Sequence, residues 1–382
     1  YMTFPDIPNS KIYNGNTTPE QDAQMKLVQN IDLTKTDLSA LQESVSFYEV
    51  AYPFLKNINL STISEKDKVE IISFLNKVLK YQIIIQNNLI FKTVFRVSFV
   101  RNEFLEQGKV RNQKYISYPP GEIIKQIGKY GRANSPDSTC LYCAFNPIIA
   151  LLETKPKVGE RIIISQWQKD DDLPFVSFPI ANNESIENEG VKKATKAFKE
   201  RMTYNHPLFA RTLELFFDFL SSEFIKSIPI TSPNAYEYLF SAYFSDITLK
   251  SAIETVEHPL EPISNYDCLI YPSVAAKHAT DNIAIKPTSV DRLRPVYLEE
   301  IIVTTTDYDN AKIYVNLFPE KIDLPIGGQV LRSSNNIKNG KIIWNDDWKT
   351  AYNKQIGNRA GEVLLLSFCA RLKDSNSIQN LC

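Results

Sequence analysis

The stretch from Thr139 to Glu153 constrains the fold of this 382-residue chain most, because it predicts a strand, a tight corner and a helix in immediate succession. Residues 140–145 form an apolar run typical of a buried strand. Asn146 followed by Pro147 is typical of a helix N-cap and the first helical position. The helical turns that follow are apolar up to Glu153. A lone carboxylate there is either a surface residue or a partly desolvated functional group, and the residues alone leave both interpretations open.

Length and composition indicate a folded globular protein with more than one packing unit. Hydrophobic residues make up 43% and charged residues 23% of the 382 positions, and this length exceeds what one core commonly supports. With 43 basic against 44 acidic residues, we expect no dominant nucleic-acid binding. No apolar run reaches the roughly 18 residues of a membrane span. The N-terminus lacks a basic-then-apolar pattern, so we expect no membrane partner and a cytoplasmic location.

The cysteines and histidines do not predict a metal site. Cys140 and Cys143 form one C-x-x-C pair, but no second pair follows. In a strand these two side chains would point to opposite faces, which favours buried thiols over a zinc or redox pair. The histidines have no metal-binding spacing, and their positions are His206, His258 and His278. We therefore expect no metal.

Periodic patterns predict a helical N-terminal unit before a mixed core. Capping-box spacings predict helix starts at Thr18 and near Ser39, with the second helix interrupted near Pro53. A third helix is expected to begin at Ser64 to Asp67. The apolar stripe of the third helix is either buried against the chain's own core or is a surface for a partner. Further strands are expected at 161–167, 266–273, 283–285, 296–305 and 312–317, and further helices at 191–202, at 207–225 and after 232.

The alternating residues 92–100 predict a strand with an arginine on one side. Arg96 would share the less apolar face with Val94 and Ser98, and the opposite face would be aromatic and aliphatic. Such an arginine can serve a cleft or can lie in water at a sheet edge. Its residue type alone does not decide between these two positions.

Three blocks of sequence, in this order, resemble the RES family, which is named for an arginine, a glutamate and a serine. The matching residues are Arg96 in VFRVS, Gly131-Arg132-Ala133-Asn134, Tyr142 in LYCA, Glu153 three residues after Ala150, and Tyr266-Asp267-Cys268-Leu269-Ile270-Tyr271-Pro272-Ser273 followed by Asn282 in DNIAI. The resemblance extends from Lys92 to Pro287 and leaves long flanks on both sides.

The resemblance implies an α+β fold. RES domains are NAD-consuming toxins of the Xre–RES toxin–antitoxin type, and their fold is similar to that of bacterial ADP-ribosyltransferase toxins. We therefore expect a mixed β-sheet, RES/ADP-ribosyltransferase-like catalytic core over residues 91–290. An N-terminal helical unit at 1–90 would precede it, and a C-terminal extension at 291–382 would pack on it.

The resemblance also implies roles for single residues. The implied catalytic residues are Glu153, Arg96 and Ser273, with Arg101 as a competitor for the place of the family arginine. The implied cofactor-binding residues are Tyr142, Arg132 and Asn282. Cleavage of NAD between nicotinamide and ribose needs a cation at the diphosphate, an anion at the ribose and an aromatic surface for nicotinamide, and these residue types supply all three.

The implied function is NAD degradation by phosphorolysis or hydrolysis, in a growth-arresting toxin or a defence effector. The expected partners are NAD as substrate, inorganic phosphate, and an inhibitory protein or a second copy of the chain. Redox use of NAD is disfavoured, because no G-x-G-x-x-G follows a strand. The alternatives are an ADP-ribosyltransferase with a macromolecular target and a catalytically inactive module that binds NAD or ADP-ribose.

Overall fold

The computed structural model describes the chain in seven main segments. They are residues 32–78, 87–180, 206–228, 236–249, 266–276, 280–309 and 325–345, with 4–5, 23, 26, 196 and 200 described singly. The predicted helices at Thr18 and at 191–202, the predicted strand at 312–317 and the tail beyond 345 lie outside the described residues.

The described strands form one large mixed sheet, and its order is β1-β7-β8-β9-β5-β2-β6-β10-β11-β12. The strands are β1 (Asn87–Leu89), β2 (Thr93–Phe99), β5 (Leu141–Ala144), β6 (Arg161–Lys169), β7 (Phe175–Pro179), β8 (Cys268–Pro272), β9 (Asp281–Ile285), β10 (Leu293–Thr306), β11 (Ile326–Lys338) and β12 (Lys341–Asn345). Strands β7 and β8 pair in parallel, whereas the other neighbours pair antiparallel. A separate hairpin joins β3 (Leu105–Glu106) to β4 (Lys109–Val110).

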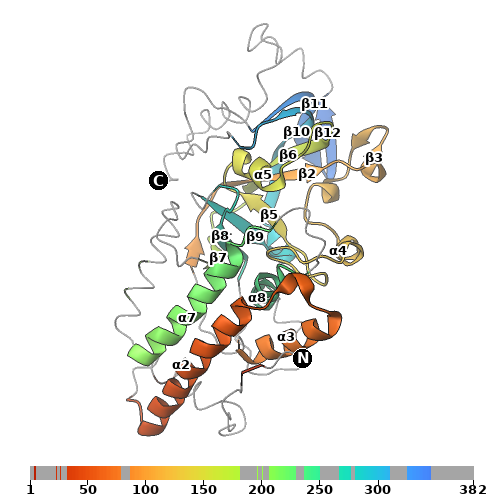
Figure 1. The fold of residues 1–382 in the computed structure, drawn as a ribbon. Coiled ribbons are helices and arrows are strands. Elements are labelled where there is room, and N and C mark those ends of the chain that lie inside the picture. Colours follow the sequence, from red (N-terminus) through yellow and green to blue (C-terminus); the bar gives the residue numbers. More distant parts are fainter. Residues whose placement is uncertain are drawn as a thin grey trace.

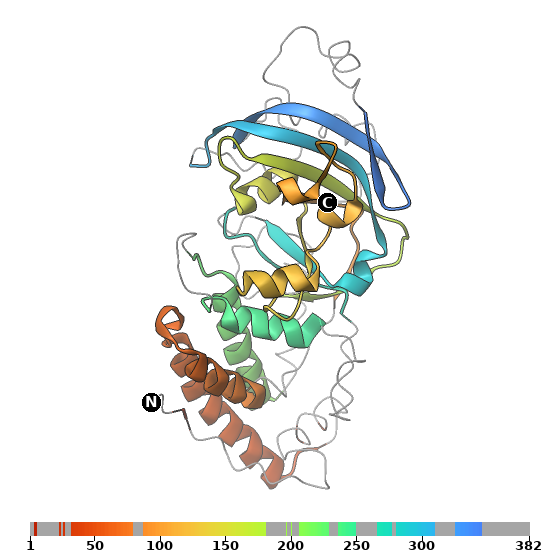
Figure 2. The same ribbon diagram turned by 90° about the vertical axis from the view of Figure 1, so that its right-hand side faces the viewer.

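The larger helices gather beyond one end of this sheet, as Figures 1 and 2 show. The helices are α2 (Lys35–Lys56), α3 (Glu65–Val78), α4 (Gly121–Ile127), α5 (Pro147–Thr154), α7 (Pro207–Phe224), α8 (Leu239–Leu249) and α9 (Pro287–Val290), with short 3-10 turns η1 (Leu60–Thr62), η2 (Asn102–Phe104) and η3 (Gln113–Tyr115). Helices α2, α3, α7 and α8 form the group beyond the sheet, and α5 packs on β2 and β5. The described part is therefore α+β, with a large mixed sheet.

Side chains alternate between two apolar layers on the faces of the sheet. Phe95 and Val97 of β2 pack in the same cluster as α5, whereas Val94 packs in a cluster on the opposite face. The predicted strand at 92–100 and its division into two faces are thus confirmed. Each large apolar side chain that is fully buried in these layers contributes about 1.5–3 kcal/mol to stability.

The two cysteines of the C-x-x-C pair also lie in different layers. Cys140 belongs to the cluster beneath the helices, and Cys143 belongs to the cluster on the other face. Burial raises the pKa of each thiol to about 12. The prediction that the two side chains point apart is confirmed, and both residues are packing groups.

Helix α2 differs from its prediction at both ends. It begins after Thr34, whose hydroxyl accepts a hydrogen bond from the Asp37 backbone N–H while the Asp37 carboxylate accepts one from the Thr34 backbone N–H. The predicted start at Ser39 is therefore wrong. The predicted interruption at Pro53 is wrong as well, because α2 continues through this proline and ends three residues later at Lys56. The predicted start of α3 is confirmed by a capping box between Ser64 and Asp67.

The sequence beyond residue 290 continues the sheet of the core. Strand β10 pairs along its length with β6, and β11 and β12 follow it in order. Residues 293–345 were expected to belong to an extension that packs on the core, but their described strands are hydrogen-bonded parts of the same sheet. Within the described segments, no helix combines the length and the apolar character that a bilayer crossing requires.

One buried carboxylate links three neighbouring strands in this part of the sheet. Glu300 of β10 is fully buried and forms an ion pair with Arg161 of β6. Its second oxygen lies 3.4 Å from Nε of Arg332 on β11. The two arginine side chains are only 23% and 16% exposed, so water screens this cluster weakly.

We expect Glu300→Gln to lower the free energy of unfolding by about 2 kcal/mol, because the amide keeps the side-chain volume but leaves two guanidinium groups without an anion. Urea denaturation measures this change. Glu103→Gln is the control, since its carboxylate is 63% exposed beside Arg101. The control should change stability by less than about 0.5 kcal/mol. Equal effects of the two substitutions would contradict a structural role for Glu300.

Candidate active site

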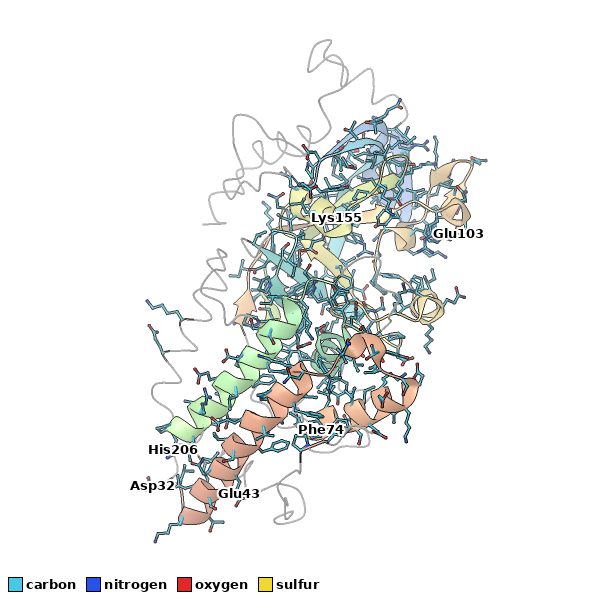
Figure 3. The ribbon with its side chains drawn as sticks, viewed as in Figure 1. Asp32, Glu43, Phe74, Glu103, Lys155 and His206 are labelled. Carbon is cyan, nitrogen blue, oxygen red and sulfur yellow. The ribbon has the colours of Figure 1, made fainter. Side chains whose placement is uncertain are left out.

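The strand–corner–helix unit predicted from the sequence is present and ends at Glu153. The Asn146 side chain accepts a hydrogen bond of 2.8 Å from the Ile148 N–H, and Pro147 occupies the first helical position. The apolar residues of α5 are buried, whereas Glu153 in its last turn is exposed. Lys155, labelled in Figure 3, ends this helix in a left-handed conformation with φ of 43°. A buried helix therefore presents one accessible carboxylate at its C-terminal end.

Ser273 and Asn282 fix that carboxylate from two other strands. The Ser273 hydroxyl donates to Oε1 of Glu153 at 2.5 Å, and Nδ2 of Asn282 donates to the same oxygen at 2.7 Å. Ser273 and Asn282 are 0% and 5% exposed, so both donors are held from within the fold. The Ala276 N–H in turn donates to the Ser273 hydroxyl at 3.1 Å. Among the described residues, Oε2 of Glu153 has no hydrogen-bond partner, which leaves it accessible to a ligand.

The glycine-containing turn before β5 is built around the hydroxyl of Tyr142. This hydroxyl accepts a hydrogen bond of 2.7 Å from the Ala133 N–H and donates one of 2.8 Å to Oδ1 of Asn134. Gly131 closes the turn with an N–H···O bond of 2.8 Å to Asn134. A Cβ on Gly131 would lie 2.4 Å from Oδ1 of Asn134 and 2.8 Å from the Tyr142 hydroxyl. The turn therefore requires glycine, and the half-buried Tyr142 shapes it.

Arg132, at the tip of the same turn, reaches the C-terminal end of helix α7. Its guanidinium donates to the carbonyl of Phe224 and, at 3.1 Å, to the carbonyl of Lys226. It also donates to the Tyr238 hydroxyl at 3.1 Å and lies 4.9 Å from the centre of that ring. Since the last carbonyls of a helix lack intrahelical partners, Arg132 caps α7.

A chain of contacts links Arg132 to Glu153 through Tyr271. The Phe224 ring lies 5.5 Å from the Tyr271 ring, and the carbonyl of the same Phe224 accepts from Arg132. Tyr271 pairs in register with Asn282, which donates to Glu153.

Burial raises the pKa of Tyr271 well above its ordinary value, the Glu153 carboxylate raises it further, and the Arg132 guanidinium opposes both. Burial also raises the pKa of Tyr238, with Arg132 lowering it and Glu153 raising it. The Glu153 carboxylate and the Arg132 guanidinium therefore both influence the pKa of Tyr238 and of Tyr271. The site has an acceptor group at Glu153 and donor groups at Arg132.

Arg96 lies apart from this site. It occupies the face of β2 opposite Phe95, and its guanidinium donates to the Ser98 hydroxyl at 3.3 Å and to the Tyr142 carbonyl at 3.1 Å. Strands β9 and β5 separate β2 from β8, which puts Ser273 about 14 Å away at ordinary strand spacing. Ser273 could approach Arg96 only if their strands were neighbours, and the sheet order separates them.

The competing arginine does not approach the Glu153 cluster either. Arg101 lies beyond the end of β2, exposed, with a guanidinium nitrogen 3.8 Å from the Glu103 carboxylate. It borders a cavity of about 540 Å³ together with Gly159 and Arg161. Of the six residues expected to form the site, the structure brings Glu153, Ser273 and Asn282 into direct contact. It places Arg132 within electrostatic range of them and Tyr142 beside Arg132, and it leaves Arg96 on the other face.

Tyr238 and Tyr271 belong to the site, but no role was expected for either of them. The apolar pattern that predicted α8 contains Tyr236, Leu239 and Phe240, and Tyr238 falls outside it. The sequence did offer one indication of a role for Tyr238. It is an aromatic residue near the start of the predicted helix that does not belong to the apolar face of that helix. Tyr271 lies inside the third matching block, in which the resemblance implies a catalytic role for Ser273 only.

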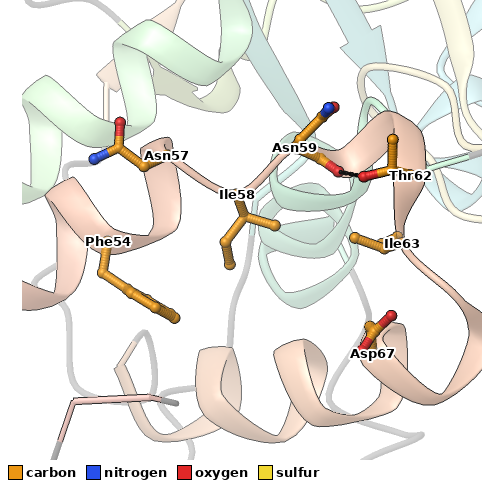
Figure 4. Close-up of a pocket in the computed structure, with 7 residues that line it drawn as sticks. All are labelled: Phe54, Asn57, Ile58, Asn59, Thr62, Ile63 and Asp67. Carbon is orange, nitrogen blue, oxygen red and sulfur yellow. Dashed lines mark hydrogen bonds between the residues drawn. The ribbon is translucent and has the colours of Figure 1, made fainter. Parts of the chain in front are cut away.

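A second cavity, of about 360 Å³, lies at the corner between α2 and α3, as Figure 4 shows. It is lined by Phe54, Asn57, Ile58, Asn59, Thr62, Ile63 and Asp67. Its polar groups are already used within the corner, because the Thr62 hydroxyl donates to the Asn59 carbonyl at 3.0 Å and Asp67 caps α3. These hydrogen bonds stabilise the helix corner around the cavity. Across the described segments, no cluster of three or more metal-binding side chains is found.

Comparison of the chain with family models, with curated proteins and with solved structures gives no match. The convergence of Glu153, Ser273 and Asn282 is therefore the basis for a functional proposal.

Proposed function

We propose that this chain cleaves NAD at the nicotinamide–ribose bond and that its core is a RES/ADP-ribosyltransferase-like catalytic domain. The observation that supports this most strongly is the pair of hydrogen bonds from Ser273 and Asn282 to one oxygen of Glu153. Ser273 and Asn282 come from the third block of the RES-like pattern, 120 and 129 positions away from Glu153 in the block before it. Their contact follows from the fold, and the sequence spacing alone does not require it.

Glu153 is placed to stabilise positive charge on the ribose. When the C–N bond breaks, its electron pair leaves with nicotinamide, and the ribose carbon becomes an oxocarbenium-like centre. A carboxylate that is already oriented stabilises this centre without reorganising during the reaction. Ser273 and Asn282 provide that orientation. A lone pair of water or of phosphate then forms the new bond to the ribose carbon, and the acceptor's proton passes to solvent.

Arg132 is the arginine that we assign to the substrate. It acts on the same tyrosines as Glu153, whereas Arg96 contacts the carbonyl of Tyr142 from the far side of the sheet. We therefore assign Arg96 a supporting role, in which it holds the strand that ends at the α5 corner. We assign the half-buried Tyr142 as the aromatic group for nicotinamide, and its hydroxyl fixes the turn that presents Arg132.

Depletion of NAD by such an enzyme would stop growth, which fits the role of a toxin or a defence effector under control of an inhibitory partner. An ADP-ribosyltransferase would use the same bond cleavage with a macromolecule as acceptor. Isotope-labelled NAD added to a cell lysate separates the two activities. Label on protein or nucleic acid indicates transfer to a macromolecule, and label confined to small molecules indicates hydrolysis or phosphorolysis.

The direct test is release of nicotinamide from NAD by the purified chain, with and without inorganic phosphate. Stimulation by phosphate, together with a phosphorylated ADP-ribose product, would identify phosphorolysis. An equal rate in both conditions, with ADP-ribose as product, would identify hydrolysis. Failure to release nicotinamide in either condition would exclude both, and binding of NAD without turnover would then favour a binding module.

A further inference from the structure

Tyr238 reaches the site from a part of the chain that lies between the second and third matching blocks. It immediately precedes α8, and its hydroxyl accepts a hydrogen bond of 3.1 Å from Nη2 of Arg132. The Arg132 guanidinium also lies 4.9 Å from the centre of the Tyr238 ring. The Tyr238 side chain is half-buried, so part of it is accessible.

The donors of this pair are not all used within the part of the chain that the structure describes. Two carbonyls and the Tyr238 hydroxyl occupy three of the five N–H groups of Arg132. The other two N–H groups, and the phenolic proton of Tyr238, have no acceptor among the described residues. Arg132 and Tyr238 therefore present a guanidinium and an O–H donor side by side.

A ligand for such a pair must be rich in acceptors and negatively charged. Phosphate oxygens meet this requirement, because they accept several hydrogen bonds and guanidinium groups pair with them in a bidentate manner. On the other side of the site, Glu153 is an acceptor and suits the cationic nicotinamide riboside. NAD has the same polarity, with its positive charge at nicotinamide and its negative charge at the diphosphate.

We infer that Tyr238 is a specificity-determining residue that donates a hydrogen bond to a phosphate oxygen of the dinucleotide beside Arg132. This inference rests on the proposed function and adds a residue that the sequence resemblance does not assign. The hydrogen bond from Tyr238 to the phosphate forms when the substrate binds, and it is equally strong in the transition state. Its loss therefore weakens binding far more than it slows the chemical step.

The test compares Tyr238→Phe with Tyr236→Phe. Both substitutions remove one hydroxyl from the same short segment, but the Tyr236 hydroxyl donates to Glu65 of α3 and does not contact Arg132. In Tyr238→Phe, the ring beneath Arg132 and the two carbonyl bonds remain, so the guanidinium stays in place. We expect KM for NAD to rise about 10-fold or more in Tyr238→Phe, with kcat changed less than about 3-fold. Tyr236→Phe should behave like the wild type.

Calorimetric binding of ADP-ribose gives a second measurement that does not depend on turnover. ADP-ribose has the diphosphate but lacks the bond that is cleaved, so its affinity should fall about 10-fold or more in Tyr238→Phe and stay unchanged in Tyr236→Phe. Inhibition by nicotinamide, which has no phosphate, should be equal in all three proteins.

The outcomes separate this inference from the proposed function. If the wild type cleaves NAD and Tyr238→Phe keeps the wild-type KM and ADP-ribose affinity, the role of Tyr238 is overturned and the proposed function stands. If the wild type binds ADP-ribose but cleaves no NAD, the proposed function fails, and the affinities still decide about Tyr238. If nicotinamide inhibition weakens as much as ADP-ribose binding, or the wild type binds no ADP-ribose, the assignment to phosphate is wrong.

Discussion

Replacement of Glu153 by Gln is expected to lower the rate of NAD cleavage by about 100-fold or more, comparable to the loss of a preorganised electrostatic group. The amide keeps the volume of the side chain and can still accept hydrogen bonds from Ser273 and Asn282, but it has no negative charge. NAD binding should weaken far less, because the lost interaction strengthens mainly as positive charge develops on the ribose. Initial rates of nicotinamide release, together with NAD affinity, measure the two effects.

Glu106→Gln is a matched control for this substitution. Glu106 is an exposed glutamate of the β3–β4 hairpin, and it should keep the parent rate. Ser273→Ala removes one of the two donors to Glu153 and should lower the rate about 10-fold without removing the charge. A Glu153→Gln protein that cleaves NAD near the parent rate would show that Glu153 has a structural role and no catalytic one.

Gly131→Ala is expected to have the largest effect on stability, a loss of about 3 kcal/mol from overpacking and a broken hydrogen bond. The added Cβ would lie 2.4 Å from Oδ1 of Asn134 and 2.8 Å from the Tyr142 hydroxyl. Asn134 is buried and is held by bonds to the Ser135 carbonyl and to Tyr142, so it cannot simply turn away. Because the same turn presents Arg132, NAD cleavage should also fall, by about 10-fold.

A double-mutant cycle with Tyr142→Phe tests the cause of this loss. Removal of the hydroxyl opens space for the new methyl group, so the combined loss of stability should be smaller than the sum of the two single losses. Urea denaturation of the four proteins measures this difference. Strict additivity would indicate that Gly131→Ala does not destabilise the protein through contact of the new methyl group with the Tyr142 hydroxyl.

The sequence predicted well those features that depend on neighbours along the chain. The corner at Asn146 and Pro147 is local, since its cap and its fixed backbone angle act within one turn. The faces of the strand that contains Arg96 follow from alternation alone. Helix α2 was predicted less well, because its capping box at Thr34 lies before the residues used for the prediction and the helix continues through Pro53.

The candidate site could be predicted only in part, because strand order is a long-range property. Glu153, Ser273 and Asn282 meet because β8, β9 and β5 are adjacent, and no spacing in the sequence requires this. The same order removes Arg96 from the cluster. Tyr238 enters the site through a hydrogen bond with Arg132, which lies 106 positions earlier in the chain, and local sequence patterns do not predict a contact over that distance.

The central claim is tested most directly by the products that the purified wild-type chain makes from NAD, separated by chromatography and identified by mass. We expect one molecule of nicotinamide for each molecule of NAD lost, with the remainder recovered as ADP-ribose or its phosphate ester. An NAD analogue with a carbon–carbon bond between the pyridine and the ribose should bind and remain intact. Unchanged NAD, or cleavage at the diphosphate of either compound to give mononucleotides, would contradict the proposed reaction.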